Sequence, residues 1–198
     1  DGLRLPLTGW YGVMRNEPFA FERVEVLRGP ASVIAGQNGP GGVVNLVSKR
    51  PLVDARSEFM LQTGNYQHRQ LGVDLTAPLN DARTLRYRLL AFGKDSGTQV
   101  KHADEERTLI APSIAWQPRP GTEMQVYGEY QKDQSGNTNA FLGYAGTLLP
   151  APHGAISPSL FIGEPDWDRY GGERTRLGYR IEQALDDSWT VRHNLRHD

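Results

Sequence analysis

Apolar and polar residues alternate along most of the chain after about residue 57. Between residues 70 and 79, for example, Leu71, Val73 and Leu75 are each followed by a glycine or a polar residue. A repeat of two residues is typical of a β-strand, because successive side chains point to opposite faces of the sheet. The pattern predicts seven strands, at about 57–64, 70–79, 85–91, 109–116, 123–130, 176–182 and 189–196.

The predicted connections differ in length in a regular way. The second, fourth and sixth connections, at 80–83, 118–121 and 186–187, are all short. The first, at 65–67, is also short, but the third and fifth are longer, at 96–105 and 131–172. Short turns at one end and long loops at the other are the plan of an outer-membrane β-barrel. Four aromatic residues near predicted strand ends suit the two membrane interfaces: Tyr66, Trp116, Tyr130 and Trp189. A soluble β-sandwich also alternates, so it stays an alternative at this point.

The alternation also assigns side chains to faces. In a membrane barrel, we expect four apolar residues to face lipid (Val73, Leu75, Leu89 and Ile181) and three charged residues to face the lumen (Asp74, Arg88 and Arg180). Pro112 interrupts its strand, because proline has no N–H to donate to a neighbouring strand. We therefore expect a bulge or an unpaired position there.

Composition narrows the possible chemistry. The chain has no cysteine, which excludes disulfides, thiolate metal sites and cysteine nucleophiles. Its 22 basic and 23 acidic residues give a net charge of −1, so no overall positive field attracts nucleic acid. No apolar run approaches the roughly 18 residues of a membrane helix.

Neither a catalytic constellation nor a metal site is indicated, so we predict that the chain is not an enzyme. His193 and His197 would share one face of a strand but lie about 13 Å apart. His102 stands beside acidic residues in a predicted loop, where a solvated charge run explains it better than a ligand set.

Residues 1–52 differ in composition from the rest of the chain, because they are rich in glycine and proline. Within them the run FERVEVLRGPASVIAGQNGPGGVVNLVSKRP, residues 21–51, begins with charged side chains that interleave with Val24, Val26 and Leu27. A strand here would be apolar on one side and charged on the other. The glycine-rich stretch that follows is not a phosphate-binding loop, since it lacks the Gly-Lys-Ser/Thr sequence.

The run at 21–51 resembles the plug signature of TonB-dependent siderophore receptors. DGLRLP at the start is similar to the plug strand that precedes the ligand-facing apex. IAPSIAWQP at 110–118 and GEPDWDRY at 163–170 are similar to the ferrichrome and ferrioxamine branch, which takes up hydroxamate siderophores. The resemblance implies an all-β fold in which a plug sits inside a 22-stranded transmembrane barrel. Residues 1–52 are then the C-terminal part of the plug domain, and residues 53–198 are the first seven antiparallel strands, with a long extracellular loop at about 133–172. Seven strands leave the barrel incomplete, so we expect the other strands in a longer protein.

The resemblance also implies a function: TonB-dependent uptake of ferric siderophores through the outer membrane of a Gram-negative bacterium. The partners would be the ferric siderophore, membrane lipid and TonB, which would act through a TonB box missing from this chain. We expect no directly bound cofactor or metal, because the siderophore already fills the coordination shell of iron. A passive porin-like channel and a soluble all-β binding module are the alternatives.

Site residues follow from the same resemblance. The ligand-facing apex of the plug corresponds to Leu5, Pro6, Trp10 and Tyr11, with Phe19 at a second loop and with Phe141 and Tyr144 on the wall side. An aromatic residue in a loop can also serve only to pack that loop. Glu25 and Arg28 are expected to form ion pairs between the plug and the barrel wall, although a solvated strand face is the simpler interpretation of these charges.

Overall fold

The computed structural model describes residues 1–5, 15–29, 41–136, 141–165 and 167–198. Strands dominate it, arranged as a two-stranded and a seven-stranded sheet, with one short 3-10 helix, η1 (Pro18–Ala20). The all-β fold expected from the alternation is confirmed. Among the described residues, no helix is long and apolar enough to cross a membrane.

The seven-stranded sheet follows chain order, and every neighbouring pair is antiparallel. Its strands are β3 (Arg56–Thr63), β4 (Arg69–Pro78), β5 (Leu85–Ser96), β6 (Glu105–Arg119), β7 (Thr122–Gly136), β8 (Arg169–Ala184) and β9 (Thr190–His197). They correspond one to one with the seven predicted strands. Several are longer than the alternation predicts, because polar and charged residues continue the ladder beyond the last apolar position, as where Glu105 pairs with Ser135.

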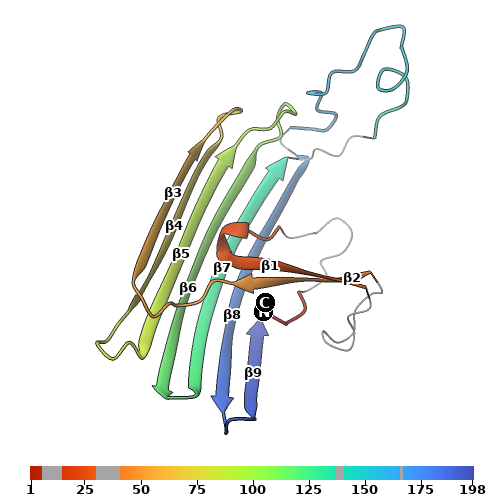
Figure 1. Ribbon diagram of the computed structural model, residues 1–198. Coiled ribbons are helices and arrows are strands. Elements are labelled where there is room, and N and C mark those ends of the chain that lie inside the picture. The colour runs from red at the N-terminus through yellow and green to blue at the C-terminus, as the bar shows by residue number, and fades with distance from the viewer. Residues whose placement is uncertain (6–14, 30–40, 137–140, 166) are drawn as a thin grey trace.

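Long connections lie at one end of this sheet and short turns at the other (Figure 1). The turns after β4, β6 and β8 are short, and Gly121 adopts a φ of +79° in the β6–β7 turn. The connection 97–104 and residues 141–165 of the β7–β8 connection lie together at the opposite end, where the Lys101 N–H donates to the backbone oxygen of Ser159. β7 and β8 extend into the segment predicted as loop at about 133–172, so the connection between them is shorter than expected.

Side chains separate to the two faces as the register requires. Val73 and Leu75 stand opposite Ala91 and Leu89, whereas Asp74 and Arg88 point to the other face, where they contact residues from the N-terminal part of the chain. The face that carries Val73 also presents large exposed side chains such as Phe59 (71% exposed) and Leu61 (77%). A continuous apolar outer face and a polar inner face are what a lipid-facing barrel wall requires.

Pro112 behaves as expected. It stands opposite Leu89 in the ladder with β5, but the ladder with β7 passes from Ile110–Tyr130 to Ser113–Tyr127 and leaves it unpaired. The register is the same before and after the gap, so the strand accommodates the missing N–H without a bulge.

The two-stranded sheet is an antiparallel hairpin of β1 (Phe21–Arg28) and β2 (Gly42–Ser48). It crosses the inner face of the larger sheet near η1, and its far end projects away from the strands (Figure 1). Gly42, with a φ of +124°, lies so close to the backbone of Leu27 that any side chain there would clash. The core between the two sheets is small and is formed by Ala20, Leu90, Phe92 and Leu109, with Phe19, Phe21, Met60 and Ala111 packed against it.

Candidate functional site

The contact between the hairpin and the inner face of the seven strands is the most chemically specific part of the molecule. Among the described residues, the segments that flank the hairpin are bound to this face by two groups of polar contacts, one before η1 and one after β2, and Arg196 of β9 separately donates to the backbone oxygen of Arg4 at 2.7 Å. The Arg107 anchor consists of residues 15–17 with Glu105, Arg107, Gln131 and Arg174; the Asp74 anchor consists of residues 49–52 with Asp74, Thr76 and Arg88.

Asp74 on β4 is the centre of the Asp74 anchor and is only 3% exposed. Arg88 on β5 donates to both of its oxygens, at 2.8 and 2.6 Å, and the Lys49 ammonium donates at 2.9 Å. Arg88 also donates to the backbone oxygen of Arg50 at 2.8 Å. Burying charges is costly unless they are paired and hydrogen-bonded. Lys49, which directly follows the hairpin, supplies part of the positive charge that compensates the buried Asp74 carboxylate of the wall.

Two further contacts extend this anchor. Thr76 on β4 accepts a hydrogen bond from the backbone N–H of Leu52 at 2.9 Å and donates to the backbone oxygen of Tyr87 at 2.8 Å. Lys49 also lies over the ring of Phe19, 4.4 Å from its centroid, where an ammonium is attracted to the π face. Between β2 and β3, both main-chain and side-chain groups therefore bind the chain to the wall.

In the Arg107 anchor, an arginine on β6 reaches the segment before η1. Arg107 donates to a Glu17 oxygen at 2.8 Å and also pairs with Asp133 of β7. The other Glu17 oxygen accepts from the backbone N–H of Phe19 at 3.0 Å and so caps η1. One buried carboxylate thus starts the helix and binds it to the wall.

Gln131 and Arg174 hold the two residues before Glu17. The Gln131 amide, fully buried on β7, donates to the backbone oxygen of Arg15 at 2.6 Å. Arg174 on β8 donates to the Asn16 side-chain oxygen at 3.1 Å and to the Gln131 side-chain oxygen at 3.0 Å. The Arg15 side chain pairs with Glu105 at 2.7 Å, but this pair is more exposed.

Between the anchors, Phe19 fills the space between the hairpin and the wall. Its ring centroid lies 5.9 Å from that of Phe92 on β5. A Cβ atom built on Gly72 of β4 would lie 2.9 Å from the Phe19 ring, which is closer than such atoms approach. Gly72 therefore makes room for this aromatic side chain.

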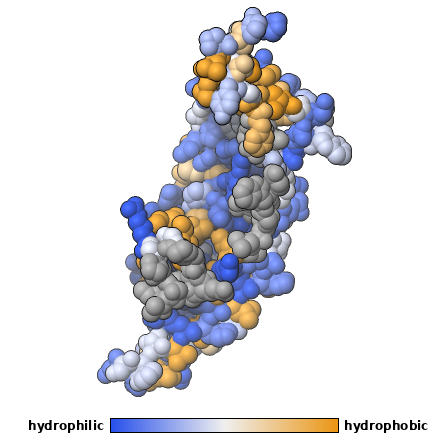
Figure 2. Space-filling view, turned by 90° about the vertical axis from the view of Figure 1, so that its right-hand side faces the viewer, coloured by the Kyte–Doolittle hydropathy of each residue, from blue (hydrophilic) through white to orange (hydrophobic). Residues whose placement is uncertain are grey.

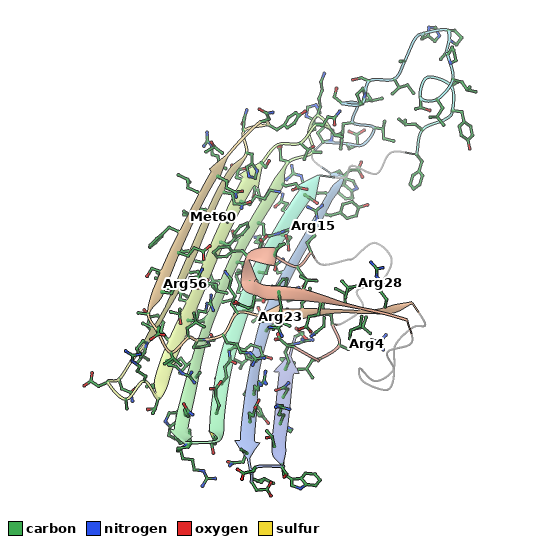
Figure 3. The ribbon with its side chains drawn as sticks, in the orientation of Figure 1. Arg4, Arg15, Arg23, Arg28, Arg56 and Met60 are labelled. Carbon is green, nitrogen blue, oxygen red and sulfur yellow. The ribbon has the colours of Figure 1, made fainter. Side chains whose placement is uncertain are left out.

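The charges predicted to pair with the wall lie elsewhere on the hairpin. Glu25 accepts from Asn45 at 2.8 Å and from Arg23 at 2.7 Å, and the hydrogen bond from Asn45, followed by that from Arg23, lowers the pKa of the carboxyl. Arg28 lies toward the free end of the hairpin, away from the seven strands (Figure 3). On β1, the Glu22 carboxylate lies 4.0 Å from the Arg88 guanidinium on the wall. Pairing of Glu25 and Arg28 with other parts of a barrel stays a prediction.

The predicted ligand contacts are not brought together within the described residues. Leu5 is half-buried, Phe19 is packed against the wall, and Phe141 and Tyr144 are 95% and 73% exposed. Pro6, Trp10 and Tyr11 lie outside the described residues. Apolar side chains gather on the connection between β7 and β8, at the top of Figure 2. Contact of these seven residues with a ligand stays a prediction.

Sequence reasoning did not identify the anchor residues. Alternation places Asp74, Arg88, Arg107 and Gln131 on a polar face, but it does not pair them with any residue before β3. The available signal was the presence of arginine and carboxylate side chains on neighbouring inward positions, which have to be neutralised if something covers them.

Comparisons with known proteins add independent findings. The family model described as TonB-dependent Receptor Plug Domain matches residues 1–43. The chain is 36% identical over 198 residues to the Ferrioxamine B receptor of Salmonella typhimurium (strain SL1344), covering 100% of this chain and 28% of that protein. It is 32% identical over 196 residues to the Ferrichrome outer membrane transporter/phage receptor of Escherichia coli (strain K12), covering 99% of this chain and 26% of that protein.

Solved structures show the same arrangement of strands. The siderophore receptor PiuA from Acinetobacter baumannii superimposes with a TM-score of 0.81 at 22% identity, over 92% of this chain and 26% of that one. At this identity the likeness concerns the fold. The chain thus spans roughly a quarter of the length of the proteins that it matches.

Proposed function

The chain belongs to the TonB-dependent siderophore receptors of the outer membrane, and we propose that it forms the junction between plug and barrel in a receptor that takes up ferric siderophores. We assign residues 1–52 to the plug and residues 53–198 to the barrel, with the extracellular loop between β7 and β8. The chain matches 28% of the length of the ferrioxamine B receptor, so most of that relative lies outside the matched part.

One observation carries the proposal: charged residues on the inner wall are buried under the hairpin and paired with it. Asp74 and Arg107 would face an open lumen if the hairpin were not a resident part of the channel. A porin uses inward charges to act on passing solutes, and it has no need to bury them under its own chain. The arrangement supports a blocked channel.

The same contacts make release of the hairpin region from the wall costly in free energy. Removing one partner of a buried ion pair costs about 3–5 kcal/mol, and two anchors hold the hairpin region at once. Spontaneous release of this region is therefore rare. A receptor built this way needs external work to open a path for a bulky ligand, which is the role we assign to TonB.

We assign the ligand to the ferric hydroxamates, on the identity to the ferrioxamine B and ferrichrome proteins. Such complexes are bulky and nearly neutral, so aromatic side chains and a few hydrogen-bonding groups suit them better than a charged pocket. The candidate contacts are Leu5, Pro6, Trp10, Tyr11 and Phe19 from the plug, and Phe141 and Tyr144 from the loop. Iron arrives already coordinated, as cargo.

The test is transport by the full-length receptor in a Gram-negative strain without other hydroxamate receptors. We expect cells to accumulate radioactive iron from ferrioxamine B or ferrichrome only when TonB is present. Accumulation that is equal without TonB would instead show a passive pore. Recovery of the full-length protein in the soluble fraction would show a soluble binding module.

A second measurement tests the ligand contacts. Replacing Trp10 and Tyr11 with alanine removes aromatic area that is worth about 1–3 kcal/mol against a ligand. Binding of ferrioxamine B to the purified receptor should weaken by roughly tenfold or more. Unchanged affinity in a folded double variant would remove both residues from the site and leave Phe141 and Tyr144 as the candidates.

A further inference from the structure

Three consecutive residues are each held by a different side chain of the barrel wall. Gln131 binds the backbone oxygen of Arg15, Arg174 binds the side-chain oxygen of Asn16, and Arg107 binds the carboxylate of Glu17. The three wall residues lie on β7, β8 and β6. Contacts from three strands to three successive residues define both the position and the direction of the chain at this point.

The burial of these contacts distinguishes them from ordinary surface pairs. Gln131 is fully buried, and Glu17 and Arg174 are 6% and 8% exposed. Because Gln131 donates to a backbone oxygen, it holds the chain whatever side chain residue 15 carries. By contrast, the Arg15–Glu105 ion pair leaves the Arg15 side chain 47% exposed, and a pair of that kind contributes little.

The position of this cluster along the chain suggests what it does. Residues 15–17 directly follow the segment in which the sequence places Trp10 and Tyr11 as ligand contacts. Arg107 stands near the start of β6, at the end of the sheet where the connection 97–104 and residues 141–165 lie. The cluster therefore fixes the point at which the predicted ligand-facing segment ends.

We propose that Asn16, Gln131 and Arg174 are positioning residues that set siderophore affinity without contacting the siderophore. This inference rests on the proposed function. A bulky, nearly neutral ligand is recognised mainly by the fit of aromatic surfaces, so its affinity depends on contacts that are already in place before it binds. A variant that releases residues 15–17 from the wall makes ligand binding bear the cost of holding them in place, and affinity falls.

The experiment compares variants of the full-length receptor by equilibrium binding of ferrioxamine B and by thermal unfolding. Asn16→Leu removes the acceptor for Arg174 at similar size, whereas Asn16→Asp retains an oxygen at that position. We expect Asn16→Leu to weaken binding by about tenfold, which is about 1.4 kcal/mol, and Asn16→Asp to stay within about threefold of wild type. The unfolding temperature of the barrel should be equal in both.

Two controls separate positioning from a general loosening of the plug. Arg15→Gln breaks only the exposed ion pair, and Lys49→Met breaks the Asp74 anchor at the other end of the hairpin. Both should bind ferrioxamine B within about threefold of wild type. Gln131→Met, which removes the main-chain contact, should weaken binding as Asn16→Leu does.

Either of two results overturns the inference. One is wild-type affinity in Asn16→Leu and Gln131→Met; the other is an equal loss in Lys49→Met, which would show that any disturbance of the plug lowers affinity. Failure of the proposed function looks different, because the wild-type receptor itself would then not bind ferrioxamine B or ferrichrome.

Discussion

Lys49 and Asp74 join the two sheets through an ion pair of 2.9 Å in which the carboxylate is 3% exposed. Lys49 directly follows β2, whereas Asp74 lies in the middle of β4, and Arg88 on β5 neutralises the same carboxylate. The pair therefore marks where the plug hairpin meets the barrel wall, at a point where removing the carboxylate would leave both Lys49 and Arg88 without their acidic partner.

Removing the carboxylate should release this end of the hairpin. In the full-length receptor, Asp74→Ala leaves Lys49 and Arg88 without their acceptor, and we expect docking of residues 41–52 to weaken by about 3–5 kcal/mol. Hydrogen exchange of the Leu52 amide, which donates to Thr76 in this anchor, should rise accordingly. Arg83→Gln, which breaks the exposed pair with Asp54, is the matched control and should leave exchange unchanged. Equal exchange in Asp74→Ala and wild type would contradict the anchor.

The close approach of Gly72 to Phe19 gives a second prediction. Gly72→Ala places a methyl group against the ring, and overpacking of this kind costs about 1–3 kcal/mol. We expect protease to cut the hairpin faster in this variant of the full-length receptor. Shortening the partner in the double variant Gly72→Ala/Phe19→Leu should restore much of the protection. If the double variant is cut faster than either single one, the two residues are not in contact.

A third prediction concerns the outer face. Val126 is exposed on β7 between Met124, which stands opposite Trp116, and Tyr130. Because Trp116 and Tyr130 are the aromatic residues expected at the two membrane interfaces, Val126→Arg in the full-length receptor puts a charge toward the bilayer interior and should cost about 2–4 kcal/mol. Trp189→Arg, next to the β8–β9 turn, should cost only about 0–1 kcal/mol because charges are tolerated near the interface. Denaturant unfolding in lipid vesicles measures both. Equal costs would mean that this face does not follow membrane depth.

Topology can be tested in intact cells. Gly143 lies in the connection between β7 and β8, and Asp186 lies in the turn between β8 and β9 at the other end of the sheet. Because residues 1–198 contain no cysteine, Gly143→Cys and Asp186→Cys each introduce a single new thiol into this part of the receptor. An impermeant maleimide should label Gly143→Cys before cell lysis and Asp186→Cys only afterwards. The reverse pattern would invert the assignment of the two ends.

The sequence by itself determined the seven strands, their order of short and long connections and the two faces of the sheet. Each of these is a local property: a repeat of two residues places Val73 and Asp74 on opposite faces wherever the strand lies. Even the unpaired position at Pro112 follows from the chemistry of one residue. The extra length of strands such as β6 does not follow, because Glu105 joins the ladder through its backbone and leaves no apolar signal.

Only the tertiary structure decided which polar groups meet. Glu17 and Arg107 are separated by 90 positions, and nothing local in either segment indicates the other, because a carboxylate and a guanidinium attract at any separation along the chain. Within the part of the chain that the structure describes, Glu17 and Lys49 pair with the wall, whereas Glu25 bonds within its own hairpin. That choice depends on how the hairpin is oriented against the strands. The orientation in turn depends on packing such as Phe19 against Gly72, where the absence of one side chain makes space for another.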